Sequence, residues 1–306
     1  MTGVEVADGV VVVSVPMGPG LSTSVTVLSG ERTVLVDAGT ADGGPGAVAR
    51  YLAGRRLTPI DTVVCTHFHH DHTGGLAEIA GDGEVDVFAH VAELGLVADP
   101  TKFTEAMSGI GVRAAPPTSH GVGAAAVLGG FELVVGGRTW EAVHVPGHTW
   151  GHLAMWSADE RLLLAGDAVQ GAGVPFRGTP GQGTGLPYYL DVDAYRQSIM
   201  RMRALAPETL VLSHENPSWD GRVLRGVELV REAFDESLAQ VDLIRDRVRS
   251  SIGPRGASVT EIVEATTTQS GVGEATPQGE LTVRAHLVQL RSEGFIAPDG
   301  GRWYPA

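Results

Sequence analysis

Residues 66–72 combine four histidines and one aspartate in a short run that could bind metal ions. The run reads Thr-His-Phe-His-His-Asp-His. His67 and His69 lie two residues apart, so in an extended chain their side chains point to the same side and can bind one ion. Asp71 and His72 come where the chain turns into a helix, so they point elsewhere and can hold a second ion. Chance would give this pattern in about 1 in 1,000 chains of this length and histidine content, so we predict a metal site.

Four apolar segments each lead into a residue that can bind metal. They are residues 62–66 before His67, 140–145 before His148, 162–165 before Asp167, and 209–213 before His214. Continuous apolar strands are typical of sheets that are covered on both faces. Sites built on sheets form where strand ends meet at one edge. A lone histidine is more often structural, but four such strand ends together predict one converging site.

Loops between these segments hold further candidates. His120 could donate a proton to a leaving group, and Tyr188 or Tyr189 could offer a hydroxyl to substrate, although a core or rim tyrosine is the alternative. His152 is predicted to support a ligand or to pack in the core, and His70 to face away from the metals. An apolar pocket lining is predicted from Phe103, Met107, Trp150 and Phe176.

The ligand pattern as a whole resembles the metallo-β-lactamase superfamily. The resemblance rests on His67-x-His69-x-Asp71-His72, Pro146-Gly147-His148-Thr149, Gly166-Asp167 and His214, in that order, and covers about residues 8–225. It implies an α/β fold, the four-layered αββα sandwich, with a binuclear site. His67, His69 and His148 would hold the first metal. Asp71, His72 and His214 would hold the second, Asp167 would bridge both, and Asp37 would support the site without being a ligand.

The expected chemistry is hydrolysis by a metal-bridged hydroxide. Two cations about 3.5–4 Å apart lower the pKa of a bridging water to roughly 7 and polarise the scissile group. Imidazole and carboxylate suit zinc, and iron or manganese also accept them. We therefore predict two divalent ions, with zinc first, and assign catalytic roles to Asp71, His120 and Tyr188.

The C-terminal part predicts a second, smaller unit. A long helix is expected over residues 222–250, short helices over 258–265 and 281–293, and a hairpin around Asp299-Gly300-Gly301. This order predicts a winged-helix-like α+β module over residues 236–306, after a catalytic domain over 1–235. The seven-residue recurrence of Val227, Phe234, Val241 and Val248 fits packing against the chain's own body, or a homodimer seam.

The layout also resembles the β-lactamase-like protein 2 group, some of whose members with such a tail act on RNA. This chain departs from that group by having Glu215 after the last ligand. Its tail is also not basic, because residues 240–306 hold seven arginines, no lysine and eight acidic residues. Nucleic-acid readers usually present a basic face, so a packing or dimerisation role is favoured for the tail.

Composition limits the partners further. The formal net charge of −14 disfavours phosphate backbones and anionic lipids. The single cysteine, Cys65, allows no intramolecular disulfide, and we predict no signal peptide, no membrane span and a cytoplasmic enzyme. The leading hypothesis is a hydrolase of a small ester, thioester or lactone. The alternatives are a ribonuclease or phosphodiesterase aided by the tail, a mono-iron sulfur dioxygenase-type enzyme, and a catalytically silent binding protein.

Overall fold

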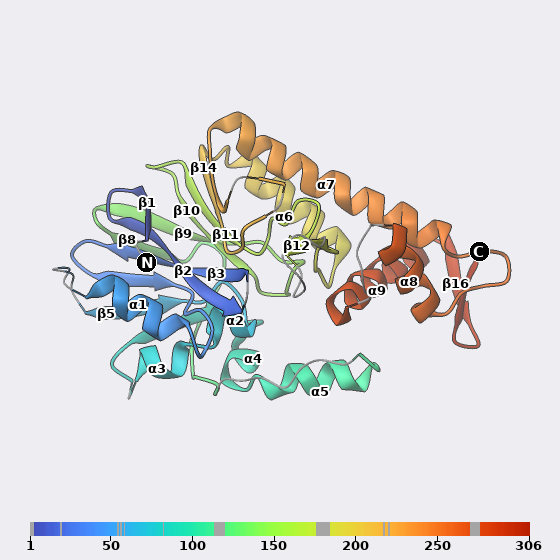
Figure 1. Cartoon of the computed structure of the whole chain (residues 1–306), viewed down its shortest axis with the longest axis horizontal. Helices are drawn as coiled ribbons and strands as arrows, with labels where there is room; N and C mark the ends of the chain where they lie inside the picture. Colours follow the sequence, from blue (N-terminus) through green and yellow to red (C-terminus); the bar gives the residue numbers. More distant parts are fainter. Residues whose placement is uncertain are drawn as a thin grey trace.

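Two β-sheets packed face to face form the body of the molecule, and a smaller group of helices with a hairpin extends from one end (Figure 1). The computed structural model describes residues 3–306 except positions 19, 54, 56, 58, 82, 113–119, 176–183, 217, 220 and 270–275. Within the described ranges, no helix is long and apolar enough to cross a membrane.

The first sheet contains the N-terminal strands in chain order. They are β1 (Val4–Ala7), β2 (Val10–Gly18), β3 (Leu21–Ser29), β4 (Thr33–Val36), β5 (Ile60–Val64), β6 (Asp86–His90) and β7 (Ala125–Val127). From β4 onward the strands run parallel, and parallel neighbours need crossover connections. The crossovers contain α1 (Gly44–Leu52), α2 (His70–Thr73), α3 (Leu76–Ala80), α4 (Leu94–Ala98) and α5 (Thr101–Gly109).

The second sheet has the strand order β15-β14-β11-β10-β9-β8. Its strands are β8 (Glu132–Val135), β9 (Arg138–His144), β10 (Leu153–Ser157), β11 (Leu162–Gly166), β14 (Thr209–Leu212) and β15 (Val223–Arg225). Between β11 and β14 come the short ribbon of β12 (Val174–Pro175) with β13 (Thr184–Gly185), and then α6 (Val192–Ala204). The Asp191 side chain caps α6 by accepting a hydrogen bond from Ala194 N–H.

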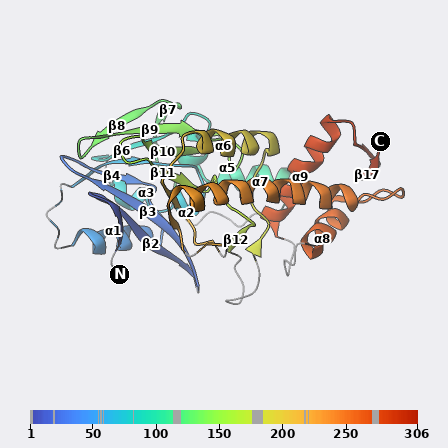
Figure 2. The ribbon, with the colours of Figure 1, turned by 90° about the horizontal axis from the view of Figure 1, so that it is seen from above.

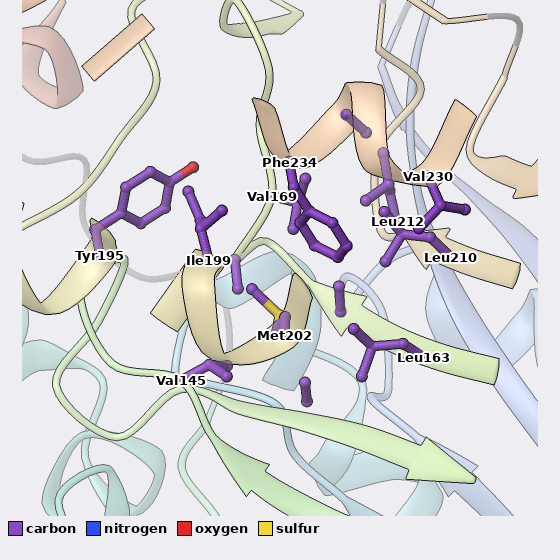
Figure 3. Packing of buried hydrophobic residues seen from close by; sticks show 14 of the residues in the cluster. Val145, Leu163, Val169, Tyr195, Ile199, Met202, Leu210, Leu212, Val230 and Phe234 are labelled. Carbon is purple, nitrogen blue, oxygen red and sulfur yellow. The ribbon is translucent and has the colours of Figure 1, made fainter. Parts of the chain in front are cut away.

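Side chains that alternate along the strands fill three apolar layers. Leu162 and Leu164 point between the two sheets, whereas Leu163 points outward and packs against α6 and the start of a long helix, α7 (Val227–Ser250). Figure 3 shows this outer layer, in which Ile199, Met202 and Phe234 surround the strand residues. On the far face of the first sheet, α1, α3 and α4 bury a matching layer. The molecule is therefore a four-layered αββα sandwich, which confirms the predicted fold class.

The C-terminal part contains α8 (Val259–Gln269), α9 (Pro277–Ser292), β16 (Ile296–Asp299) and β17 (Arg302–Pro305). The continuous helix α7 joins it to the sandwich (Figures 1 and 2). Val230 and Phe234 pack on the sandwich, whereas Ile244 and Val248 pack in the C-terminal core. The helix–helix–hairpin order agrees with the prediction. The winged-helix assignment and the division into residues 1–235 and 236–306 stay predictions.

Several predicted helix boundaries differ from the structure, among them the start of α9, which is Pro277 instead of Leu281, and the end of α8, which is Gln269 instead of Ala265. Residues 223–225 form β15 instead of the first turn of a helix, because they pair with β14, and α7 begins only at Val227. The helix expected at Ser258 begins at Val259, since Ser258 exchanges hydrogen bonds with Glu261 as a capping box. Of the seven-residue recurrence in α7, Phe234, Val241 and Val248 are buried within the chain, while Val227 is exposed. Packing against the chain's own body thus accounts for those three positions.

Candidate metal centre

Seven histidine and aspartate side chains meet at one edge of the sandwich and form two clusters. The first contains His67, His69, His148 and Asp167, and the second contains Asp71, His72, Asp167 and His214. His67 and His69 follow β5, whereas Asp71 and His72 lie on α2. His148 follows β9, Asp167 follows β11, and His214 follows β14, so both sheets contribute to each cluster. The structure thus brings together all the ligands proposed from the sequence.

In the first cluster, three ring nitrogens face one another at hydrogen-bond distance. Nδ1 of His69 lies 2.8 Å from Nε2 of His67 and 3.1 Å from Nε2 of His148. The Nδ1 atoms of His67 and His148, which face away from the cluster, already have hydrogen-bond partners. His148 Nδ1–H donates to the Tyr188 carbonyl at 2.7 Å, and His67 Nδ1 lies 3.0 Å from the Thr66 hydroxyl, which donates its own proton to Asp37. The Nε2 lone pairs of His67 and His148 therefore point into the cluster.

The second cluster is built in the same way around carboxylate oxygens. His214 Nε2 lies 3.2 Å from an Asp71 oxygen and 3.3 Å from Asp167 Oδ2, and His72 Nε2 lies 3.5 Å from that same Asp167 oxygen. The outer nitrogens are again bonded away from the cluster, because His72 Nδ1–H donates to Asp37 and His214 Nδ1–H donates to the Ser22 carbonyl. Asp167 Oδ2 also lies 3.7 Å from His148 Nε2, so one oxygen faces both clusters.

The nitrogen and oxygen atoms that face each other in the two clusters are better satisfied by two bound cations than by hydrogen bonds to one another. The Nε2 atoms of His67 and His148 lie 3.2 Å apart without protons and cannot satisfy each other, and His69 Nδ1 can donate to only one of them. Among the described buried atoms, His72 Nε2 and Asp167 Oδ1 have no hydrogen-bond partner. Buried polar atoms without partners are costly unless another group satisfies them. Imidazole nitrogens and carboxylate oxygens that lie within 4.8 Å of one another are a donor set that zinc takes in proteins.

The protonation states differ between the two clusters. Burial, followed by repulsion from neighbouring histidines, lowers the pKa of His67 well below its ordinary value. Burial also lowers the pKa of His148 to about 4, so these rings are neutral and free to bind a cation at pH 7. Burial opposes a charge on His214 as well, but Asp167 and Asp71 outweigh it and raise the pKa of His214 to about 10. A proton on this ring must leave before a metal can bind there.

Asp37 supports the site from outside both clusters, as predicted. Its carboxylate accepts hydrogen bonds from His72 Nδ1–H and from the backbone and hydroxyl of Thr66, each at 2.7 to 3.0 Å. Asp37 has a φ of 67°, a left-handed conformation that Asp tolerates better than most residues. A carboxylate behind a ligand histidine fixes the ring orientation and its tautomer.

His152 and Glu93 hold the ligand loops in place. The His152 ring stacks on His67 with centroids 4.7 Å apart, and its Nε2 accepts the Asp167 N–H. The fully buried Glu93 accepts from Phe68 N–H at 3.0 Å and from Gly151 N–H at 2.6 Å, so it joins the two loops that carry the first cluster. Glu93 was missed in the sequence, because nothing in its local pattern marks it.

The other residues that the sequence singled out, Tyr188, His120 and His70, differ in how far they are buried. Tyr188 is buried, its ring centroid lies 5.1 Å from that of His69 and 5.0 Å from that of His148, and its hydroxyl has no partner among the described atoms. Burial raises the pKa of this phenol, so it stays protonated. His120 is exposed, and His70 has a half-exposed ring. The catalytic roles of Tyr188, His120 and Asp71 stay predictions.

An apolar wall lies beside the first cluster. Met107, Tyr188 and Leu281 pack together, and the Phe103 ring lies 6.1 Å from that of His69. Trp150, which was also expected to line a pocket, is half exposed, and Phe176 lies outside the described residues.

The family is established by comparison with known proteins. The model of the metallo-beta-lactamase superfamily matches residues 17–214, and the chain belongs to this superfamily. It is 27% identical over 194 residues to the beta-lactamase-like protein 2 homolog of Drosophila melanogaster, a region that covers 61% of this chain and 56% of that protein. It is 28% identical over 225 residues to hydroxyacylglutathione hydrolase of Aeromonas hydrophila, which covers 72% of each.

A solved structure shows the same fold over the whole chain. The metallo-beta-lactamase family protein from Thermus thermophilus aligns with a TM-score of 0.78 at 21% identity and covers 99% of this chain and 100% of that one. The family match and the hydrolases among the relatives make the chain a metallo-hydrolase of this superfamily. Hydrolases of the superfamily use divalent metals, typically zinc, and the chain carries a histidine and aspartate cluster that could bind them.

Proposed function

We propose that the protein binds two divalent cations, zinc first, and hydrolyses a small ester, thioester or lactone. The observation that carries this proposal is the pair of ligand clusters that share Asp167. Such a pair of cations, when bound, supplies hydroxide at neutral pH and a Lewis acid for the carbonyl oxygen. His67, His69 and His148 would hold one cation, Asp71, His72 and His214 the other, and Asp167 both.

The protein's own residues define the surroundings of the reaction. Tyr188, Met107 and Leu281 place apolar surface beside the first cluster, which suits the uncharged body of a carbonyl substrate. Burial raises the pKa of the Tyr188 phenol, so its hydroxyl keeps its proton and would donate a hydrogen bond to a substrate group that enters the buried space beside it. In the metal-free protein Asp71 also pairs with the protonated His214, whose Nε2 lies 3.2 Å from an Asp71 oxygen, and this proton would leave when the two residues bind the cation.

The choice of a carbonyl substrate has two supports. Several curated relatives carry the name hydroxyacylglutathione hydrolase, and an acylglutathione is a thioester. The net charge of −14 also disfavours polyanionic substrates such as RNA. We therefore place thioester cleavage first among the three carbonyl classes.

The test is an activity panel beside a metal analysis. Protein prepared with zinc is assayed on a hydroxyacylglutathione, a p-nitrophenyl ester, a lactone and bis-p-nitrophenyl phosphate, with metal content measured by elemental mass spectrometry. We expect roughly two zinc ions per chain and cleavage of at least one carbonyl substrate. Cleavage of the phosphodiester alone would favour the phosphodiesterase, and about one iron with oxygen consumption would favour the dioxygenase.

A further inference from the structure

The segment of residues 186–189 lies between the sandwich and the C-terminal helix α9, and it is packed from both sides. Leu186 belongs to the C-terminal apolar core together with Val283 of α9. Tyr189 belongs to the core of the sandwich, where its ring stacks on Tyr195 with centroids 4.7 Å apart. The segment is therefore a place where the two parts of the molecule meet.

The same segment orients one proposed metal ligand. His148 is buried, and its Nδ1–H donates to the carbonyl of Tyr188 at 2.7 Å. This bond sets the tautomer and directs Nε2 into the first cluster. The position of the Tyr188 carbonyl thus determines where Nε2 of His148 points.

Two buried side chains of α9 hold the residues on either side of Tyr188, Thr282 through the backbone of Pro187 and His286 through the side chain of Tyr189. The Thr282 hydroxyl donates to the Pro187 carbonyl at 2.7 Å. The Tyr189 hydroxyl lies 2.7 Å from Nε2 of His286, and burial lowers the pKa of His286 to about 3, so the neutral ring can accept this bond. Thr282 and His286 are four residues apart and share one face of the helix. Both are fully buried.

Gln170 holds the segment from the side of the sandwich. Its Oε1 accepts from Tyr188 N–H at 2.7 Å, and its Nε2 donates to the Tyr188 carbonyl at 2.8 Å and to the Asp167 carbonyl at 2.9 Å. The Tyr188 peptide is consequently fixed between Gln170 and α9. Removing the bonds from α9 leaves the Tyr188 peptide hydrogen-bonded only on the side of the sandwich, to Gln170 and His148.

We infer that α9 is part of the metal centre, with Thr282 and His286 as positioning residues that act on His148 through residues 187–189. The C-terminal module then has a function within the hydrolase that requires no nucleic acid. This inference rests on the proposed metal centre but not on the identity of the substrate.

The test replaces Thr282 by Val, which keeps the shape of the side chain and removes the hydroxyl. Zinc affinity is measured by competition with a chromophoric chelator, and the visible absorption spectrum of the cobalt-loaded protein reports the ligand geometry. Loss of an outer-shell partner typically weakens metal binding by 10–100-fold, so we expect a loss of about tenfold and a changed cobalt spectrum. Thr282→Ser retains the hydroxyl and is expected to restore the affinity and spectrum of the unaltered chain.

Thr267→Val is the matched control. Thr267 is also buried in the C-terminal module, and its hydroxyl donates to the Val263 carbonyl of its own helix, away from the site. Both variants lose the buried hydrogen bonds of one hydroxyl group, so both should melt at a lower temperature, but only Thr282→Val should lose zinc affinity. Equal zinc affinity in the two variants would overturn the inference.

A second variant covers the case in which Thr282→Val does not fold. Tyr189→Phe removes only the hydroxyl that bonds His286. It should weaken zinc binding in the same direction, and unchanged affinity would refute the role of α9. An unaltered chain that binds no zinc would instead refute the proposed function, so the two failures are distinguishable.

Discussion

Asp167 is the residue on which both clusters depend, because its Oδ2 faces histidines from each. This oxygen lies 3.3 Å from His214 Nε2, 3.7 Å from His148 Nε2 and 4.0 Å from His67 Nε2. Asp167→Asn keeps the shape but removes the charge. We expect bound zinc to fall from roughly two ions per chain to one or none. Hydrolysis should fall by more than the ~10–100-fold that loss of an outer-shell partner costs.

Elemental analysis and the carbonyl substrate panel check this expectation. Asp159→Asn is the control, because Asp159 is an exposed carboxylate in the turn before β11. It should leave zinc content and activity unchanged. Full zinc content in Asp167→Asn would contradict the shared role of this carboxylate.

The protonation states of the second cluster predict that zinc binding releases protons at pH 7. The pKa of His214 is raised to about 10, and the carboxylates around His72 raise its pKa well above the ordinary value despite burial. Both rings are therefore protonated on both nitrogens at pH 7 in the metal-free protein. A metal can bind only the neutral ring, in which one nitrogen has lost its proton. Binding should release roughly two protons from these rings, and affinity should rise with pH up to the pKa of His214.

Calorimetry in buffers of different ionisation enthalpy measures this release. The slope of the observed enthalpy against the buffer enthalpy gives the number of protons. His214→Gln removes one of the two rings and should reduce the slope. A slope near zero in the unaltered chain would show that the two rings are neutral before zinc arrives.

At the scale of elements, the turn between β9 and His148 depends on a glycine that no other residue can replace. Gly147 has a φ of 130°, and a Cβ at this position would lie 2.4 Å from the backbone N and Cα of Tyr195 in α6. Neither backbone can move easily, since the Gly147 carbonyl also accepts the Leu190 N–H at 2.7 Å. Gly147→Ala should therefore lower the free energy of unfolding by about 3 kcal/mol or more.

Urea unfolding of the metal-free protein measures this loss. Gly137→Ala is the matched control, because Gly137 has a φ of 73° and open space where its Cβ would lie. That variant meets only the left-handed backbone penalty of about 1–2 kcal/mol. Equal losses in the two variants would show that the contact with α6 contributes nothing.

The strands that lead into the ligands were predictable from the sequence, but the residues that hold the ligand loops in place were not. Each ligand segment is a local apolar run followed at once by His or Asp, so the strand ends before His148, Asp167 and His214 follow from local pattern. Glu93 and Thr282 are different. Thr282 bonds a carbonyl 95 positions away, and Glu93 bonds an N–H 58 positions away, so only the folded chain brings the partners together. Residues 223–225 were misjudged for the same reason, because pairing with β14 makes them a strand.

At the scale of the whole molecule, the metal centre lies where the two sheets meet. His67 and Asp71 come from the side of the first sheet, while His148 and His214 follow strands of the second. Each proposed cation would therefore link the two halves of the sandwich. A ligand that binds only the native state stabilises it by about 4 kcal/mol when its concentration is 1,000 times its dissociation constant. Metal removal is thus expected to lower stability as well as activity.

Thermal unfolding with and without chelator tests this link between metal and fold. For a chain of this size, about 4 kcal/mol corresponds to a fall of roughly 10 °C in the melting temperature, and added zinc should restore it. Asp167→Asn supplies the internal control, because a chain that binds little metal should melt at one temperature whether or not chelator is present. A chelator effect of equal size in both proteins would mean that the chelator acts elsewhere. If chelator changed the melting temperature of neither protein, the two halves of the sandwich would hold together without the cations. The buried carboxylates of the second cluster would then be balanced by the protons on His72 and His214 alone.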